Sequence, residues 1–254
     1  MKTSKLIYHL QKIFPKKNSL KKDYLGLQIG TFKENTNKIA ICLDFNNNVF
    51  KKITKKNIDL IITHHPFIYG NILDVIKNDQ AKKQLISKIN KLKVPIYSIH
   101  TNFDCADNGM NYLLAKKLKL KNIKKIDKNK IIRTGFLEKN MTITEFAKYV
   151  KKCLKLPYVY IIKNNNKKIK KIGICGGSGS NMFKIAKDNK CDIFCSGDAP
   201  QHVRNNIKNY NYNYLEIFHE VEKIFIPSMK NIIKKINNKI EIFCIDEQKY
   251  PKII

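Results

Sequence analysis

The sequence predicts an α/β protein made of two lobes, each a mostly parallel sheet covered by helices. A chain of 254 residues is long enough for two small lobes. Short apolar segments rich in β-branched residues alternate with stretches long enough for helices, a pattern typical of parallel sheets. A polar, lysine-rich stretch at 119–130 separates two such series. We therefore expect an N-terminal lobe at residues 1–125 and a C-terminal lobe at residues 126–254.

The N-terminal lobe is predicted to begin with a helix. Leu6, Leu10 and Phe14 recur at helical spacing, Ser4 is a candidate N-cap, and Pro15 ends the run. The compact apolar segments that follow are predicted strands, at Ile39–Leu43, Leu60–Thr63 and Ile96–Ile99. Further helices are predicted over Gln80–Leu92 and Gly109–Leu118.

The C-terminal lobe repeats the alternation. Thr142 and Glu145 match a capping box for a helix that reaches Leu154. Predicted strands follow at Tyr158–Ile162, Lys171–Cys175, Ile193–Ser196, Tyr214–Phe218 and Glu241–Cys244. Predicted helices lie between them at Asn181–Asp188, Ala199–Lys208 and after Val221.

Composition excludes several classes of protein. The longest apolar runs, such as Leu60-Ile61-Ile62, fall far short of the roughly 18 residues that a membrane-spanning helix needs. The N-terminus lacks the apolar core of a secretory signal, so we expect a cytoplasmic protein without a membrane partner. The seven cysteines are odd in number and scattered, which favours reduced, buried thiols over a disulfide framework.

The net charge of +30 favours anionic partners. Most of this charge comes from lysine, which attracts phosphate but is less suited than arginine to bidentate recognition of bases. We therefore expect any binding of nucleic acid to be weak and non-specific.

Three segments place side chains that can bind metals directly after apolar strands. The first contains His64 and His65, and the second contains His100 and Asp104. The third contains His219 and Glu222, which share a face of a helix that starts there. Each segment alone has a structural interpretation; Asp104, for example, could cap the next helix. Together they supply five candidate ligands, His64, His65, Asp104, His219 and Glu222, and converging strand ends would bring these into one metal-containing cleft between the lobes.

Other polar residues are weaker candidates. The turn Gly176-Gly177-Ser178-Gly179 could cradle a phosphate, but a tight strand-to-helix connection explains it equally. Asp44 and His202 are interpreted as structural. Asp23 and Gln28 could line the cleft.

With these motifs the chain resembles the GTP cyclohydrolase 1 type 2 homologues, also called NIF-three-like dinuclear metal proteins. The resemblance covers nearly the whole chain and includes Thr63-His64-His65-Pro66, His100-Thr101-Asn102-Phe103-Asp104, Asp23 to Gly30, Cys175 to Gly179 and Ser196-Gly197-Asp198. It implies two divalent metals per subunit, zinc, iron or manganese, held by His64, His65, Asp104, His219 and Glu222. It also implies a toroidal homohexamer, and His100 matches a site residue that we interpret as catalytic.

The C-terminal motif departs from the family pattern. Family members often carry one more residue between the histidine and the glutamate, so an alignment anchored on Glu222 places Phe218 at the ligand position. Glu220 would then be an alternative ligand. Some members also carry an inserted domain, for which the short connection at 163–171 leaves no room.

The leading hypothesis for function is a dinuclear metal-dependent hydrolase that acts on a nucleotide or another phosphorylated small molecule. The resemblance implies opening of the guanine ring of GTP. One alternative is a non-enzymatic hexameric metal-binding scaffold whose basic surface binds nucleic acid. Another is a phosphodiesterase or phosphatase that uses the same metals.

Overall fold

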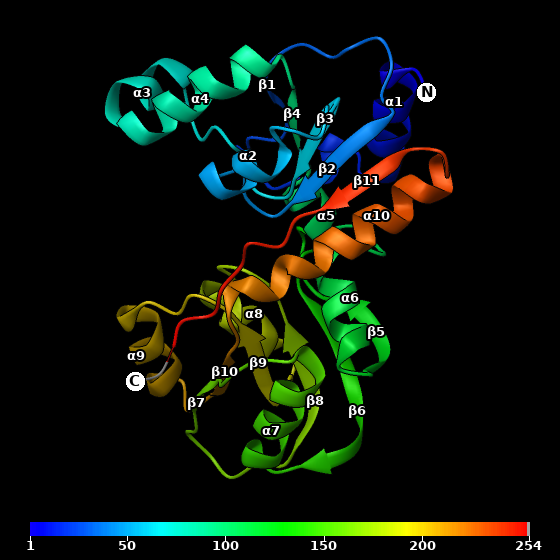
Figure 1. Cartoon of the computed structure of the whole chain (residues 1–254). Coiled ribbons are helices and arrows are strands. Elements are labelled where there is room, and N and C mark those ends of the chain that lie inside the picture. The colour runs from blue at the N-terminus through cyan, green and yellow to red at the C-terminus, as the bar shows by residue number, and fades with distance from the viewer. Residues whose placement is uncertain (253–254) are drawn as a thin grey trace. The chain divides into compact units, whose positions relative to one another are not determined.

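The computed structural model describes residues 1–252, and the chain forms two compact units. Unit 1 contains Met1–Phe103 and Phe225–Gln248, and unit 2 contains Asp104–Ile224 and the C-terminal residues from Lys249 on. Each unit has one sheet with helices packed on it (Figure 1). The predicted α/β class with two lobes is thus confirmed.

The division of the chain differs from the predicted boundary at residue 125. The chain enters unit 2 at Asp104, and the lysine-rich stretch contains strand β5 (Lys121–Lys125), which pairs with β6 (Arg133–Met141) at the edge of the sheet of unit 2. Exposed lysines protect such an edge strand from pairing with other chains, and they also give it the composition of a linker. The segment from Phe225 to Gln248 returns to unit 1.

Unit 1 is built on a sheet of mostly parallel strands. The strand order is β1 (Gly26–Ile29), β4 (Ile96–Ser98), β3 (Leu60–Thr63), β2 (Lys38–Cys42) and β11 (Glu241–Cys244). All neighbours are parallel except β1, which pairs with β4 in the antiparallel sense. Every residue of β3 is buried, which explains why this strand reads as an unbroken apolar run.

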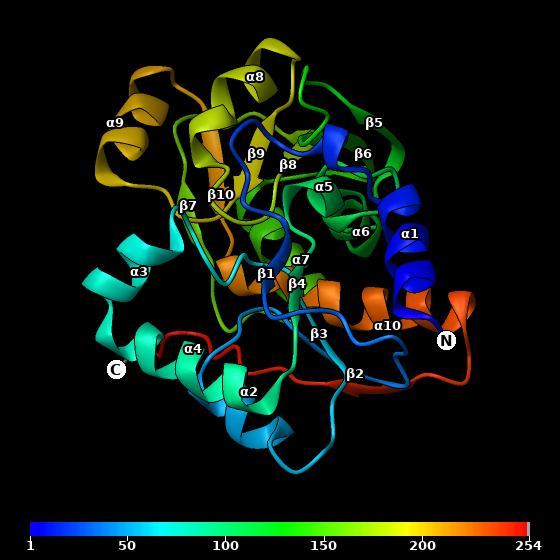
Figure 2. The same ribbon diagram turned by 90° about the horizontal axis from the view of Figure 1, so that it is seen from above.

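Helices cover both faces of this sheet. They are α1 (Thr3–Ile13), α2 (Asn47–Ile53), α3 (Ile72–Asn78), α4 (Gln80–Leu92), the short α5 (Thr101–Asp104) and α10 (Phe225–Ile236). Helices α2 and α4 share one apolar cluster with β2 and β3, and Figure 2 shows α1 and α10 on the opposite face. The predicted N-cap at Ser4 is wrong: Lys2 is the N-cap, two residues earlier, and the Thr3 amide donates to the Glu34 carbonyl at 2.9 Å.

Unit 2 has a mixed sheet with a parallel centre. The strand order is β5, β6, β8 (Ile169–Ile174), β9 (Ile193–Ser196), β10 (Asn213–Glu216) and β7 (Tyr160–Ile162). Strands β8, β9 and β10 run parallel, whereas β5, β6 and β7 pair in the antiparallel sense. The sequence pattern predicted the three parallel strands and missed β5 and β6.

The main helices of unit 2 are α6 (Met110–Lys117), α7 (Ile143–Leu154), α8 (Phe183–Asp188) and α9 (Gln201–Asn209), and a 3-10 helix, η3, covers His219–Ile224. The predicted capping box of α7 is confirmed, since the Thr142 amide donates to Glu145 at 2.7 Å and the Glu145 amide donates back to the Thr142 hydroxyl at 3.2 Å. No helix within residues 1–252 has the length and apolar character needed to cross a bilayer.

Both units present polar side chains at the carboxyl ends of three neighbouring parallel strands. In unit 1, β2 leads to Asp44, β3 leads to His64 and His65, and β4 leads to His100. In unit 2, β8 leads to Gly177, β9 to Asp198 and β10 to His219. Because these strand ends lie at one edge of a sheet, each unit gathers its polar groups in one place.

Candidate metal centre

Unit 1 gathers three histidines. The side chains of His64, His65 and His100 each place one ring nitrogen within 4.8 Å of the other two. The distances between ring centroids are 5.0 Å for His64 and His65, 5.2 Å for His64 and His100, and 5.7 Å for His65 and His100. Imidazole nitrogens at this spacing form a donor set that suits zinc, iron or manganese.

Each of these histidines is fixed through its Nδ1 atom. His64 Nδ1 lies 3.0 Å from the Ile99 carbonyl oxygen, and His65 Nδ1 lies 2.7 Å from Asp44 Oδ1. His100 Nδ1 lies 2.7 Å from Asp23 Oδ1. A histidine that binds a metal through Nε2 almost always donates its Nδ1 proton to a carboxylate or a carbonyl, which fixes the tautomer and the ring orientation. The three side chains therefore fit a divalent metal.

Asp23 is the best-anchored of these carboxylates. In addition to His100, it accepts hydrogen bonds from the Thr101 amide at 3.1 Å and the Thr101 hydroxyl at 2.5 Å. Burial alone would raise the pKa of Asp23, but the hydrogen bonds with His100 and Thr101 outweigh it and lower the pKa to about 2. The ionised carboxylate is thus the form that the fold selects.

This shift predicts a pH-dependent effect of Asp23→Asn on the metal-free protein. Because the pKa of the native state lies below that of the unfolded chain, the stabilisation is complete above about pH 4 and is lost as the pH falls toward 2. Urea unfolding should show a free energy of unfolding lower by about 1–3 kcal/mol at pH 6 and a smaller difference at pH 3. The exposed control Asp74→Asn should cost little at either pH; an Asp23→Asn deficit that is unchanged at pH 3 would contradict this assignment.

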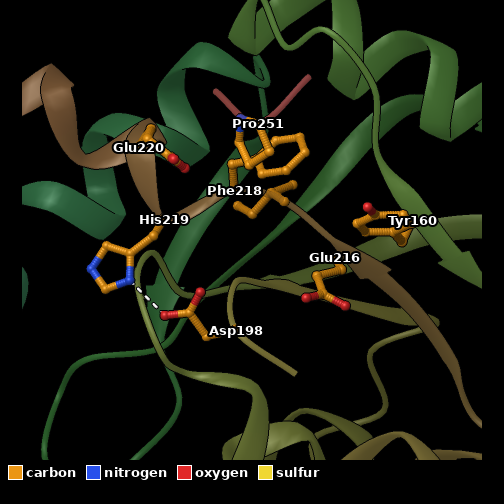
Figure 3. Close-up of a pocket in the computed structure, with 8 residues that line it drawn as sticks. Tyr160, Asp198, Glu216, Phe218, His219, Glu220 and Pro251 are labelled. Carbon is orange, nitrogen blue, oxygen red and sulfur yellow. Dashed lines mark hydrogen bonds and ion pairs between the residues drawn. The ribbon is translucent and has the colours of Figure 1, made fainter. Parts of the chain in front are cut away.

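Unit 2 repeats the histidine–carboxylate arrangement. His219 Nδ1 lies 2.6 Å from Asp198 Oδ2 (Figure 3). His219 Nε2 lies 3.0 Å from Glu222 Oε2. Ser178 donates its hydroxyl hydrogen to the same Asp198 oxygen. Burial lowers the pKa of His219, but the hydrogen bonds with Asp198 and Glu222 raise it to about 11. The surrounding carboxylates therefore favour positive charge at this position.

Gly177 allows the backbone to approach this pair. Its φ of +59° is in the left-handed region, and a Cβ added there would lie 2.4 Å from Glu222 Oε1 and 3.4 Å from His219 Nε2. The Gly176 amide donates to Asn111 Oδ1 at 2.7 Å, which holds the turn against α6. The glycine-rich turn is thus a tight connection that makes room for Glu222, one of the two interpretations that the sequence allowed.

Gly177→Ala is expected to weaken metal binding by tenfold or more, because the new methyl group displaces the Glu222 carboxylate. Equilibrium titration with Zn²⁺ or Mn²⁺ measures this directly. The control is Gly70→Ala, which also has a positive φ (+86°) but meets no atom within 4 Å. Both variants carry the backbone strain of about 1–2 kcal/mol. Equal metal affinities for the two variants would show that the steric contact with Glu222 is irrelevant.

Family comparison agrees with these motifs. The family model described as Duf34/NIF3 (NGG1p interacting factor 3) matches residues 1–251. This chain belongs to the DUF34/NIF3 family. The resemblance inferred from the sequence motifs is therefore confirmed.

Individual members of the DUF34/NIF3 family match over nearly the full length. A protein of Clostridium perfringens named GTP cyclohydrolase 1 type 2 homolog is 28% identical over 259 residues, covering 99% of this chain and 98% of its own. A protein of Ureaplasma parvum with the same name is 31% identical over 212 residues, covering 80% and 79%. The crystal structure of a Bacillus cereus protein related to NIF3 has the same fold, with a TM-score of 0.92, 20% identity, and coverage of 100% of this chain and 99% of that one.

Asp104, a predicted ligand in this DUF34/NIF3 chain, is the last residue of α5. The alternative that it caps the next helix is wrong, because α6 begins at Met110 after Gly109. Side chains hold the backbone around Asp104 in place. Asn111 Nδ2 donates to the Asp104 carbonyl at 3.4 Å. The buried Arg133 donates to the carbonyl oxygens of Cys105 and Ala106, at 3.1 and 2.7 Å.

In the C-terminal motif of this chain, the side chains of His219 and Glu222 contact each other. Phe218 instead packs edge-to-face on Tyr158 at 4.7 Å between ring centroids and lies 5.5 Å from Tyr250. Figure 3 shows Glu220 on the other side of His219 from Asp198, with the dashed contact running between His219 and Asp198. Among the alternatives that the sequence left open, the local geometry of unit 2 thus favours His219 over Phe218 and Glu222 over Glu220.

Sequence reasoning missed the carboxylates that orient the histidines. The sequence favours a structural role for Asp44, does not decide the role of Asp23, and contains Asp198 only within a family motif. Asp44 and Asp198 share a signal that could have revealed them, since each follows the end of a strand next to the strand that carries its histidine. His202, interpreted as structural, is an exposed residue of α9.

Proposed function

We propose that this protein is a dinuclear metal-dependent hydrolase that acts on a nucleotide. His64, His65, Asp104, His219 and Glu222 would hold two divalent metal ions. The reaction would be the opening of the guanine ring that the names of the relatives imply. Two ions bound in this way would polarise the substrate and supply hydroxide at neutral pH.

The single observation that carries the proposal is that the Nδ1 atom of each site histidine is held by an oxygen atom. All four that belong to the candidate site, His64, His65, His100 and His219, have Nδ1 within 2.6–3.0 Å of a carboxylate or carbonyl oxygen. This arrangement prepares Nε2 for a metal or for proton transfer. Three of the four partners are aspartates, which also raise the basicity of the ring.

The path of the chain supports a ligand set drawn from both units. The chain leaves unit 1 directly after Phe103 and re-enters it at Phe225. Within unit 1 the rings of these two residues lie 6.1 and 5.1 Å from the His64 ring, between centroids. Asp104 is the next residue after Phe103, and Glu222 precedes Phe225 by three residues. Two of the three proposed ligands that belong to unit 2, Asp104 and Glu222, are therefore within three residues in the chain of rings that pack near His64.

In this proposal His100 carries protons rather than binding a metal. Its ring is held by Asp23, and it lies beside His64 and His65 without belonging to the ligand set that the family motifs imply. A positioned imidazole can deliver a proton to the leaving nitrogen or remove one from the attacking water. Asp23 would keep the ring in one orientation during this exchange.

A reconstitution experiment tests the function. The protein is stripped with a chelator, reloaded with Zn²⁺, Mn²⁺ or Fe²⁺, and screened against GTP, other nucleotides and phosphodiesters. We expect turnover of a nucleotide that disappears with the chelator and returns with a metal. Hydrolysis of a phosphate ester with an intact base would favour a phosphodiesterase or phosphatase. Salt-sensitive DNA binding without turnover would favour the scaffold.

We also infer a homohexamer, as the resemblance to the family implies. In unit 1, α3 has no buried residue and exposes Ile72 and Leu73, with 37% and 70% of their surface accessible. Apolar side chains that project from such a helix are typical of a contact with another subunit. Light scattering with metal present should give a mass near six chains, and a stable monomer at micromolar concentration would contradict the inference.

Nucleic acid is retained as a weak, non-specific partner. The 50 Lys+Arg residues attract phosphate at any sequence, and nothing in a lysine-rich surface selects a base. Binding should therefore fall steeply with salt, and tight preference for one DNA sequence over random competitor would overturn this inference.

A further inference from the structure

Unit 2 contains a pocket next to His219 that the proposed metal chemistry does not use. Its volume is about 170 Å³, and its walls include Tyr160, Asp198, Glu216, Phe218, His219 and Glu220. Figure 3 shows Tyr160 and Glu216 on the side opposite His219. The pocket is large enough for part of a small ligand.

Most of the ionisable groups that line this pocket are carboxylates, which accept hydrogen bonds; His219, which is paired with Asp198 and Glu222, is the exception. The described residues that line it include three carboxylates and neither lysine nor arginine, although the chain as a whole has a net charge of +30. Glu216 is held in place: its Oε1 accepts from the Ala199 amide at 3.2 Å, and its Oε2 accepts from Arg204 Nη2 at 2.8 Å. A carboxylate oxygen can accept more than one hydrogen bond. The pocket therefore selects N–H donors and disfavours phosphate.

The apolar walls of the pocket are aromatic. Tyr160 lies on the edge strand β7 and exposes 50% of its surface. Phe218 is supported from behind by Tyr158, whose ring is perpendicular to it at 89° and 4.7 Å away. The Arg204 guanidinium lies over the Tyr160 ring, 5.9 Å from its centroid. The exposed part of the ring, beside fixed acceptors, is suited to stacking against a planar heterocycle.

We propose that this pocket binds the heterocyclic base of the substrate, with the ring stacked on Tyr160 and its N–H donors directed at Glu216. Guanine, with N1–H and a 2-amino group on one edge, has the donor pattern that a carboxylate accepts. Because His219 is both a wall of the pocket and a proposed metal ligand, a base bound here lies beside the metal-binding side chains of unit 2. The inference rests on the proposed function and adds the residues that hold the base of its substrate.

Nucleosides test the pocket without any phosphate contribution. Equilibrium binding of guanosine, inosine and 1-methylguanosine is measured by calorimetry on the metal-loaded full-length protein. Inosine lacks the 2-amino group, and 1-methylguanosine lacks N1–H. We expect each to bind at least about tenfold more weakly than guanosine, since a hydrogen bond to a charged group is lost. Equal binding of all three nucleosides would overturn the proposal.

Substitutions test the protein side of the same contacts. Tyr160→Leu and Glu216→Gln should each weaken guanosine binding by about tenfold, whereas Tyr160→Phe should retain it. The control for Glu216→Gln is Glu241→Gln, because Glu241 is also a strand glutamate and pairs with Lys38 at 3.3 Å. The control for Tyr160→Leu is Tyr8→Leu, because Tyr8 also exposes about half of its surface, at 55%. Guanosine binding that survives both Tyr160→Leu and Glu216→Gln would refute the pocket.

The outcomes separate this inference from the proposed function. Nucleotide turnover with a KM that is unaffected by Tyr160→Leu and Glu216→Gln would leave the hydrolase standing and refute the pocket. Guanosine binding that depends on both residues, in a protein that turns over no nucleotide with any metal, would support the pocket and refute the hydrolase. Unchanged thermal unfolding of each variant confirms that a loss of binding is local.

Discussion

Asp104→Asn is expected to remove most of the bound metal and to lower nucleotide turnover by roughly 10²-fold or more. The amide keeps the size of the side chain but removes the charge that balances the metal. A protein that has lost the ion has no metal-bound water to supply hydroxide at neutral pH. Metal content by elemental analysis and turnover at saturating nucleotide measure the two effects on the same sample.

The matched control for this variant is Asp107→Asn, three residues further along the chain. The Asp107 side chain is 86% exposed and pairs with Lys125 on the surface, so its loss should leave metal content and rate nearly unchanged. An Asp104→Asn protein that is depleted of metal but turns over nucleotide at the wild-type rate would refute the mechanism. The scaffold hypothesis would then be the better account.

His100→Ala should separate proton transfer from metal binding. If His100 carries protons, the rate falls by roughly 10² or more while both metals remain bound. Asp23→Asn should give a smaller loss of rate in the same direction, because the imidazole remains but is no longer held by the carboxylate at 2.7 Å. His202→Ala, on the exposed surface of α9, is the control and should behave as wild type.

Parallel loss of metal in His100→Ala would assign the residue to the ligand set instead. The ring nitrogens of His64, His65 and His100 lie within 4.8 Å of one another, so this outcome has a clear structural meaning. A variant that keeps both its metals and its full rate would remove His100 from the mechanism altogether.

The candidate ligands His64 and His65 were predictable because they follow a buried strand. A run such as Leu60–Thr63 is recognisable from local sequence, and the polar residues after it must lie at the carboxyl end of a sheet. The orienting aspartates were harder to predict. The Asp23–His100 and Asp198–His219 contacts join residues 77 and 21 positions apart, and no local pattern encodes such a pairing.

The organisation of the two units was predicted only in part for the same reason. Strand β11 pairs in parallel with β2, so that Ile242 lies opposite Ile39, and only the folded structure shows that the C-terminal segment returns to unit 1. Strand β6 was missed because its buried first half begins with Arg133, Thr134 and Gly135 and its second half is exposed and polar, so neither half gives an apolar signal. Local patterns therefore specified elements, whereas long-range pairing decided which unit each element joins.

The most direct test of the central claim is a crystal structure of the metal-loaded protein, with anomalous diffraction measured at the absorption edge of the metal. The account predicts two ions roughly 4 Å apart, bound by His64, His65, Asp104, His219 and Glu222. Ions bound elsewhere would contradict it. So would a structure in which these five side chains lie more than about 10 Å apart, which is too far for two ions at the separation of two-metal sites.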